Sequence, residues 1–150
     1  DVDPTTGAIR SNRLKTCIAV RNTSGVALLP KRLVTWASGS FTEVDGYNNT
    51  TDTASAGVVD EHLTSAGVAN NDVFWLTVSG PTEVKLGPGK EAAADTVLTS
   101  LTAAASTAST TAGQAQTAAA SFLQAGYIGR AISAGTTAQD VLAIVNLVRS

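Results

Sequence analysis

The sequence predicts a mainly β protein, a small barrel or sandwich of about seven to nine short strands. Short runs rich in β-branched and aromatic residues recur at intervals of about 8–12 residues, and turn-forming segments separate them. The length of 150 residues suits one domain. The composition is dominated by small residues, with 25 Ala, 21 Thr, 13 Ser and 13 Gly, and only 15% is charged. This composition favours a structural or binding module over an enzyme.

The first sixteen residues differ from the rest because they show no sustained hydrophobic period. Pro4 and Gly7 discourage a helix there, so residues 1–16 are predicted to form an extended N-terminal arm. Residues 17–150 are predicted to form a single β-rich domain. Its first strand is the β-branched run 17–21, which ends in the turn 22–25.

Further short strands are predicted where apolar residues gather before a turn, and in residues 41–44 apolar and polar residues alternate. They cover residues 33–37, 41–44 and 57–61. Residues 73–78 form the strongest core strand, since five of these six positions are apolar. Ser79-Gly80-Pro81 is interpreted as a turn into a second strand, Thr82 to Leu86, which would complete a hairpin.

Residues 91–125 have a different composition, rich in Ala, Thr and Ser. Helical spacing of Val97, Leu101, Ala104 and Ala108 predicts a partly helical insertion, although Thr and Ser weaken helices. Two final strands are predicted at residues 127–132 and 141–148.

Charge is distributed unevenly along the chain. Residues 1–32 carry six basic and two acidic side chains, whereas residues 33–150 carry four basic and ten acidic ones. A basic N-terminal end on an acidic body suggests docking to an acidic surface, and a solvated tail without a partner is the alternative. No aromatic residue lies in the first 35 positions, so the stacking typical of single-strand nucleic-acid binding is missing, and no nucleic-acid partner is predicted.

No set of residues in the sequence predicts catalysis. His62 lies beside Asp60 and Glu61 and is interpreted as an exposed strand end, because near neighbours rarely converge as a triad. Cys17 begins an apolar strand and is interpreted as a small core residue. Residues 87–90 lack the spacing of a phosphate-binding loop and are predicted to form a turn. We therefore predict no enzymatic activity, no catalytic residues, no cofactor and no metal.

One Cys and one His exclude the usual zinc sites and a disulfide framework. No apolar run reaches the roughly 18 residues of a membrane span, so no membrane partner is predicted. Four aromatic residues lie on predicted strands, where a core position is the favoured interpretation and a sugar- or peptide-binding groove is the alternative. They are Trp36, Phe41, Phe74 and Trp75.

The order of segments resembles a pattern found in head proteins of tailed bacteriophages. The strand Gly57-Val58-Val59 leads through the turn-rich residues 65–72 into residues 73–81, and residues 126–133 precede a short polar loop and a final apolar strand. Over residues 17–150 the chain is similar to the small β-barrel decoration, or cement, proteins of phage capsids.

The resemblance implies a non-enzymatic structural protein on the outer capsid surface of the virion. Its partners would be the major capsid protein and neighbouring copies of itself, as a homotrimer. The arm would bridge shell subunits, and the basic residues of the arm and of the stretch that continues it to residue 32 would contact the capsid. These are Arg10, Arg13, Lys15, Arg21, Lys31 and Arg32.

Two other functions remain open at this point. One is a carbohydrate- or receptor-binding β-module of a fibre or surface protein, suggested by the two Trp residues and the Asn/Thr-rich loop 48–55. The other is a shell or tail-tube subunit that assembles by itself.

Overall fold

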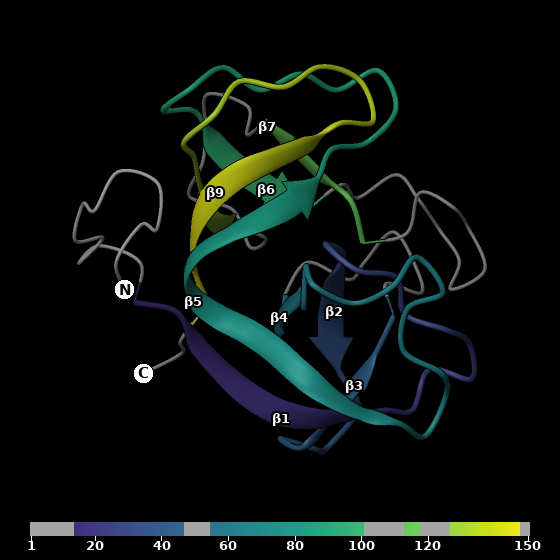
Figure 1. The fold of residues 1–150 in the computed structure, drawn as a ribbon. Helices are drawn as coiled ribbons and strands as arrows, with labels where there is room; N and C mark the ends of the chain where they lie inside the picture. The colour runs from purple at the N-terminus through teal and green to yellow at the C-terminus, as the bar shows by residue number, and fades with distance from the viewer. Residues whose placement is uncertain (1–13, 47–54, 101–112, 118–126, 148–150) are drawn as a thin grey trace, which may run out of the picture.

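The computed structural model describes residues 14–46, 55–100, 113–117 and 127–147, and these ranges contain nine strands. The strands are β1 (Thr16–Asn22), β2 (Leu33–Trp36), β3 (Glu43–Asp45), β4 (Gly57–Val59), β5 (Val73–Lys85), β6 (Val97–Ser100), β7 (Ala115–Thr117), β8 (Tyr127–Ala131) and β9 (Asp140–Asn146) (Figure 1). They form one continuous sheet in the order β1-β3-β2-β4-β5-β9-β8-β6-β7. The predicted mainly β fold is confirmed.

The first lobe is a closed five-stranded barrel made of β1, β3, β2, β4 and the first half of β5. It closes because β1 pairs antiparallel with β5, with Ile18 opposite Leu76 and Val20 opposite Phe74. Side chains that alternate along these strands point into the barrel and make its core. The buried core residues are Val20, Leu28, Val34, Val44, Ala56, Val59, Val68, Phe74, Leu76 and Val78.

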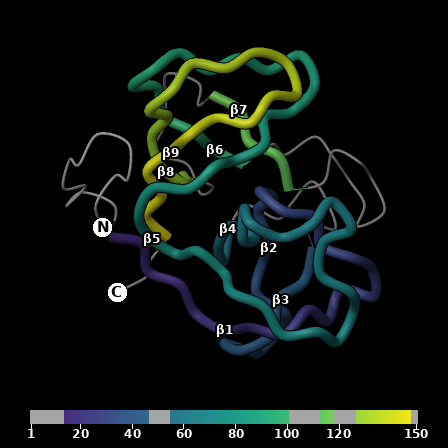
Figure 2. Tube along the Cα trace, in the orientation of Figure 1, coloured from purple at the N-terminus to yellow at the C-terminus, as the bar shows by residue number. Residues whose placement is uncertain are grey.

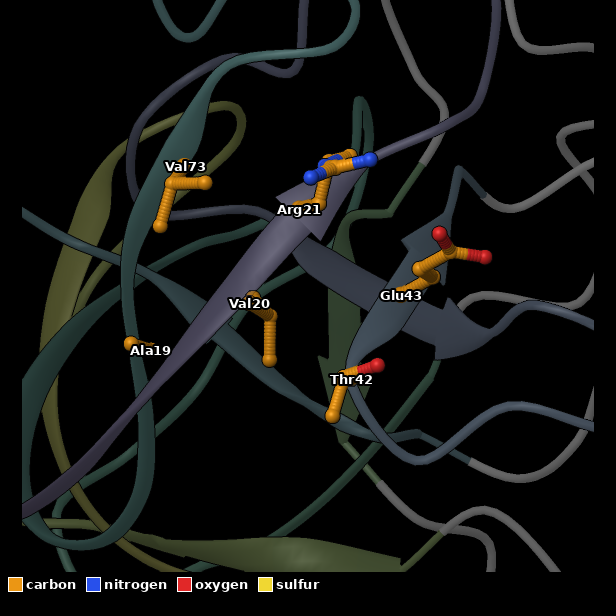
Figure 3. A pocket seen from close by; sticks show the side chains of 6 residues that line it. All are labelled: Ala19, Val20, Arg21, Thr42, Glu43 and Val73. Atoms are coloured by element: carbon orange, nitrogen blue, oxygen red, sulfur yellow. The ribbon is translucent and has the colours of Figure 1, made fainter.

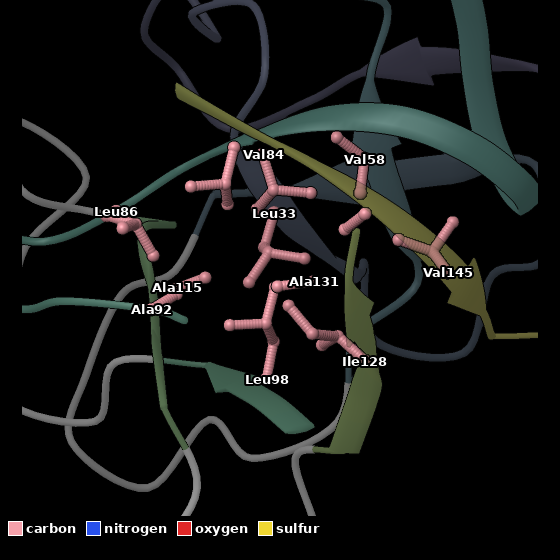
Figure 4. Packing of buried hydrophobic residues seen from close by; sticks show 12 residues of the cluster. Leu33, Val58, Val84, Leu86, Ala92, Leu98, Ala115, Ile128, Ala131 and Val145 are labelled. Atoms are coloured by element: carbon pink, nitrogen blue, oxygen red, sulfur yellow. The ribbon is translucent and has the colours of Figure 1, made fainter. Parts of the chain in front are cut away.

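The second lobe contains the second half of β5, followed in the sheet by β9, β8, β6 and β7. A single parallel bridge between Leu86 and Ala115 returns β7 to the end of β5, which brings this half of the sheet into a second ring. Its core also receives the outward-facing side chains of Leu33 and Val58 from the first lobe (Figure 4). The other members are Val84, Leu86, Ala92, Leu98, Ala115, Ile128, Ala131, Val141, Ala143 and Val145.

The predicted hairpin at Ser79-Gly80-Pro81 is wrong, because β5 runs unbroken through these residues for 13 positions. Along the second half of β5, alternate residues turn their N–H groups toward β9, and Pro81 belongs to the other set, with Glu83 and Lys85. The N–H groups of that set point away from β9, to the carboxylate of Glu61 and the carbonyl of Lys31. Pro81 therefore costs the β5–β9 ladder no hydrogen bond, and the strand passes from one lobe into the other.

The partly helical insertion predicted at residues 91–125 is not supported by the parts of it that the structure describes. Residues 97–100 form β6, where Leu98 is buried and pairs with Gly129 and with Thr117 of β7. Pairing with strands distant in sequence overrides the local helical spacing. Residues 101–112 and 118–126 lie outside the described ranges, as do residues 1–13 of the predicted arm. No helix in the described part of the chain is long and apolar enough to cross a membrane.

Candidate functional site

The two lobes meet at a waist around the middle of β5, and both ends of the described chain lie there. The backbone of Leu14 and Lys15 packs against Gly80, and Leu147 donates its backbone N–H to Val78 at 2.8 Å. Figure 2 shows β1 beginning and β9 ending on the same side of the molecule, beside β5. The two ends of the described chain therefore lie on one side of the molecule.

Glu61 holds the first described residues, at Lys15, against the middle of β5. One carboxylate oxygen accepts from the Lys15 ammonium at 3.0 Å, and the other accepts from the backbone N–H of Glu83 at 2.6 Å. Burial alone would raise the pKa of Glu61, but the N–H of Glu83 and the Lys15 ammonium outweigh it and hold the pKa below its ordinary value. The carboxylate of Glu61 is thus held ionised, as part of the fold.

A second ionic cluster joins the lobes on β5. The Lys31 ammonium, from the first lobe, lies 2.6 Å from Glu83 and 2.7 Å from Asp140, and Lys85 lies 3.2 Å from Asp140. The hydrogen bonds to Asp140 and Glu83 raise the pKa of Lys31. Burial would raise the pKa of Asp140, but the hydrogen bonds from Lys31 and Lys85 lower it.

The basic residues that the sequence predicts for partner contact therefore lie in different environments. Lys15 and Lys31 are engaged in the intramolecular ion pairs just described, and Arg32 is half-buried. Arg21 is exposed at the end of β1. Arg10 and Arg13 lie outside the described residues. The four described residues thus differ in burial and in their partners, and the role of the six basic residues in partner contact stays a prediction.

Arg21 borders a shallow hollow of about 240 Å³ on the surface of the first lobe. Figure 3 shows Ala19 and Val73 on one side of the β1 ribbon, and Thr42 and Glu43 on the other. The hollow is lined by Ala19, Val20, Arg21, Thr42, Glu43 and Val73. Its lining combines three apolar residues with one threonine, one basic and one acidic residue, and we take it as the candidate functional site.

Large apolar side chains lie close to this hollow in the sheet. Trp75, on β5 opposite Ala19, is 59% exposed, and Val73, opposite Arg21, is 64% exposed. The Phe41 side chain is 85% exposed, and its ring makes an edge contact with the ring of Trp36.

The predicted core position is thus confirmed for the buried Phe74 and for Trp36, which packs partly against the core, and wrong for Phe41 and Trp75. Phe74 and Trp75 are neighbours on one strand, so only one of them can face the barrel interior.

The residues considered for catalysis are His62, Cys17 and residues 87–90. His62 is exposed at a turn, with its imidazole 3.6 Å from Glu61. The Cys17 sulfur is half-buried and lies 3.7 Å from the Thr77 hydroxyl, so its core interpretation holds only in part. The predicted turn at residues 87–90 is confirmed by the hydrogen bond from Lys90 to Gly87. Within the described ranges, no group of three or more His, Cys, Asp or Glu residues could hold a metal ion.

Comparison with known proteins identifies solved structures with a similar fold, two of which are phage head proteins. The head fibre gp8.5 N base of bacteriophage phi29 matches with a TM-score of 0.51 and 13% identity, over 91% of this chain and 98% of that one. A chain in the capsid of Myoviridae phage XM1 matches with a TM-score of 0.57 and 16% identity, over 93% of this chain and 88% of that one. No family model and no curated protein matches the sequence. The predicted resemblance to phage head proteins is therefore confirmed at the level of the fold.

Proposed function

We propose that this protein is a non-enzymatic structural component of a phage virion that binds the outer surface of the capsid. The observation that carries the proposal is the likeness of nearly the whole chain to nearly the whole of two phage proteins, one from a head fibre base and one from a capsid. Both lobes take part in the likeness, since it covers more than nine tenths of this chain. Their location on phage heads is extended here to this protein.

The waist supports a bridging mode of attachment. Because Lys15 is anchored to Glu61 and its backbone packs on Gly80, the chain that precedes it starts from a fixed point. In our proposal, residues 1–13 bridge neighbouring subunits of the major capsid protein, and copies of the protein contact each other as a homotrimer. An arm that orders on docking loses about 1–2 kcal/mol of conformational entropy per residue, which pairing with the shell must offset.

The test is co-sedimentation of the purified protein with capsids of its phage that lack it. We expect saturable binding by the full chain and at least tenfold weaker binding by a variant without residues 1–13. This deletion keeps Lys15 and its ion pair with Glu61, so we expect the variant to fold, which circular dichroism checks. Undiminished binding by the truncated variant would exclude the bridging role of residues 1–13, and no binding by the full chain would exclude the capsid function itself.

A carbohydrate- or receptor-binding module is the second candidate, favoured by the exposed rings of Phe41 and Trp75. Aromatic faces on a protein surface stack on sugars, but Phe41 lies before β3, where its ring packs against Trp36, and Trp75 lies on β5. A glycan array separates the candidates, because a capsid-binding protein has no requirement for sugar. Specific glycan binding that is lost in Trp75→Ala would favour the second.

A further inference from the structure

The edge of β1 that faces the candidate hollow carries main-chain groups without strand partners. Within β1, alternate residues direct their N–H and C=O groups to opposite edges. Asn22 donates to Asp72 on the β5 side, whereas Arg21 donates to Thr42 on the β3 side. By the same alternation, Ile18 and Val20 face β5, and Ala19 faces the other edge.

β3 lies beside this edge only at the last two residues of β1. The parallel pairing of β1 with β3 covers only Arg21 opposite Glu43 and Asn22 opposite Val44. Before Glu43 the chain folds into a tight turn, in which Ser40 donates to Ala37. Among the residues that the structure describes, the N–H and C=O of Ala19 therefore have no strand beside them, and Ala19 is exposed.

The charges beside this edge are also unpaired. Arg21 and Glu43 lie opposite each other on adjacent strands, yet neither makes an ion pair within the described part of the chain. A partner segment that carries charged residues of both signs would complement them. Trp75 and Val73 add exposed apolar area next to Ala19, in a place where the small Ala side chain leaves room above the sheet.

We propose that this edge of β1 receives an extended segment of the capsid shell protein, which adds as a strand beside Ala19 and places a side chain in the hollow. This inference rests on the proposed capsid function. Main-chain pairing selects an extended peptide as the occupant, and side chains that enter the hollow select its sequence. The short edge lies between β5 and the turn before β3, so it suits a slim single strand better than the surface of a second folded copy.

Ala19→Pro tests the proposal by removing a single donor, the backbone N–H of residue 19. Proline removes the outward N–H and its ring blocks the approach of a strand, whereas the β1–β5 ladder loses nothing because that N–H faces away from β5. Ala19→Val is the matched control, since it keeps the N–H and suits a strand. In co-sedimentation with capsids that lack this protein, we expect the proline variant to bind at least about tenfold more weakly than the unchanged protein. The reasons are a lost hydrogen bond and a steric block. The valine variant should bind within about twofold of the unchanged protein.

Amide hydrogen exchange keeps the test decisive if the proline variant does not fold. In the free protein the Ala19 amide should exchange fast and those of Ile18 and Val20 slowly. On capsids the Ala19 amide should become protected. An Ala19 amide that is already protected in the free protein, or that stays unprotected on the capsid, would overturn the proposal.

The remaining outcomes separate this inference from the proposed function. Equal binding by the unchanged protein and a folded proline variant would refute strand addition and leave the capsid function standing. Absence of binding by the unchanged protein would refute both. Self-association in light scattering that the proline variant abolishes would assign the edge to a second copy, and would overturn the assignment to the shell protein.

Discussion

The two lobes share β5 but differ in how many residue pairs close each ring and in the size of their core side chains. The first lobe closes through a ladder of six residue pairs between β1 and β5, whereas the second closes through one bridge between Leu86 and Ala115. The core of the first lobe includes Phe74 and has one alanine among ten residues. The core of the second has no aromatic residue and four alanines among twelve. Because the second core has less apolar area per residue, we expect the second lobe to be the weaker one. Since the lobes share β5, and Leu33 and Val58 of the first lobe pack in the core of the second, we also expect the stability of each lobe to depend on the other.

Leu98→Ala gives the strongest test of this dependence. Leu98 is fully buried in the core of the second lobe, so its truncation should cost about 2–5 kcal/mol of unfolding free energy. Both tryptophans of the chain, Trp36 and Trp75, lie in the first lobe, and their fluorescence reports on it alone. Because β5 runs through both cores, we expect urea denaturation followed by Trp fluorescence to show the full loss.

The control is far-UV circular dichroism on the same samples. If the Trp transition stays at its original midpoint while circular dichroism shows an earlier, separate step, the lobes unfold independently and the dependence is refuted.

Gly80→Ala tests the waist between the lobes. Gly80 has a φ of +102°, and an added Cβ would lie 2.4 Å from the Leu14 carbonyl oxygen and 2.9 Å from the Lys15 Cα. The substitution should cost about 1–3 kcal/mol, since backbone strain is combined with displacement of the first residues of the described chain. Thermal and urea unfolding measure the loss.

Gly89→Ala is the matched control for Gly80→Ala, because Gly89 also has a positive φ, of +67°, but has no atom within 4 Å of an added Cβ. Equal losses in the two variants would mean that the contact with Leu14 contributes nothing beyond the backbone conformation.

Lys31→Met tests the ionic cluster, with a smaller expected effect. These side chains are partly exposed, so we expect about 0.5–1 kcal/mol at neutral pH, measured by urea denaturation. The lowered pKa of Asp140 means that its contribution is present above the ordinary value of 3.8 and is lost as the pH falls through the lowered pKa. The raised pKa of Lys31 means that its contribution is present below 10.5 and is lost as the pH rises through the raised pKa.

The difference between Lys31→Met and the unchanged protein should therefore be constant near neutral pH and shrink at both extremes. Lys90→Met is the control, since Lys90 makes no ion pair within the described ranges. A difference that persists unchanged at pH 2 would show that Lys31 stabilises the fold by packing of its alkyl chain instead.

The accuracy of the sequence predictions also differs between the lobes. The strands β1, β2 and β4 of the first lobe were predicted within a few residues, because each is a short run of apolar or β-branched residues that ends in a local turn signal. β8 and β9 were predicted equally well for the same reason. β6 and β7 were missed, since a four-residue and a three-residue strand in an Ala-, Thr- and Ser-rich segment carry almost no period of their own.

The continuity of β5 and the candidate site were beyond sequence reasoning for another reason. Whether Pro81 breaks a strand depends on which edge its missing N–H would face, and that edge is fixed by β9, some sixty residues later. The hollow joins residues 19–21, 42–43 and 73, which no local pattern connects. Lys15 and Lys31 carry the same charge in the sequence as Arg21, and only the fold shows that their carboxylate partners lie on distant segments.

The smallest expected effect has the opposite sign and comes from the second lobe. Ser100, at the end of β6, is 2% exposed, and its hydroxyl has no hydrogen-bond partner within the described part of the chain. A buried unpaired hydroxyl costs free energy, so Ser100→Ala should raise the unfolding free energy by up to about 1 kcal/mol, measured by urea denaturation.

Thr77→Ala is the comparison in the first lobe. Thr77 is equally buried on β5, but its hydroxyl lies 3.7 Å from the Cys17 sulfur, so its loss should destabilise the protein or leave it unchanged. Since Trp fluorescence reports on the first lobe, a gain from Ser100→Ala seen by that signal would show that the first lobe is stabilised by better packing in the second. A loss would instead mean that the Ser100 hydroxyl is satisfied in solution, and that the second lobe is better packed than its alanines indicate.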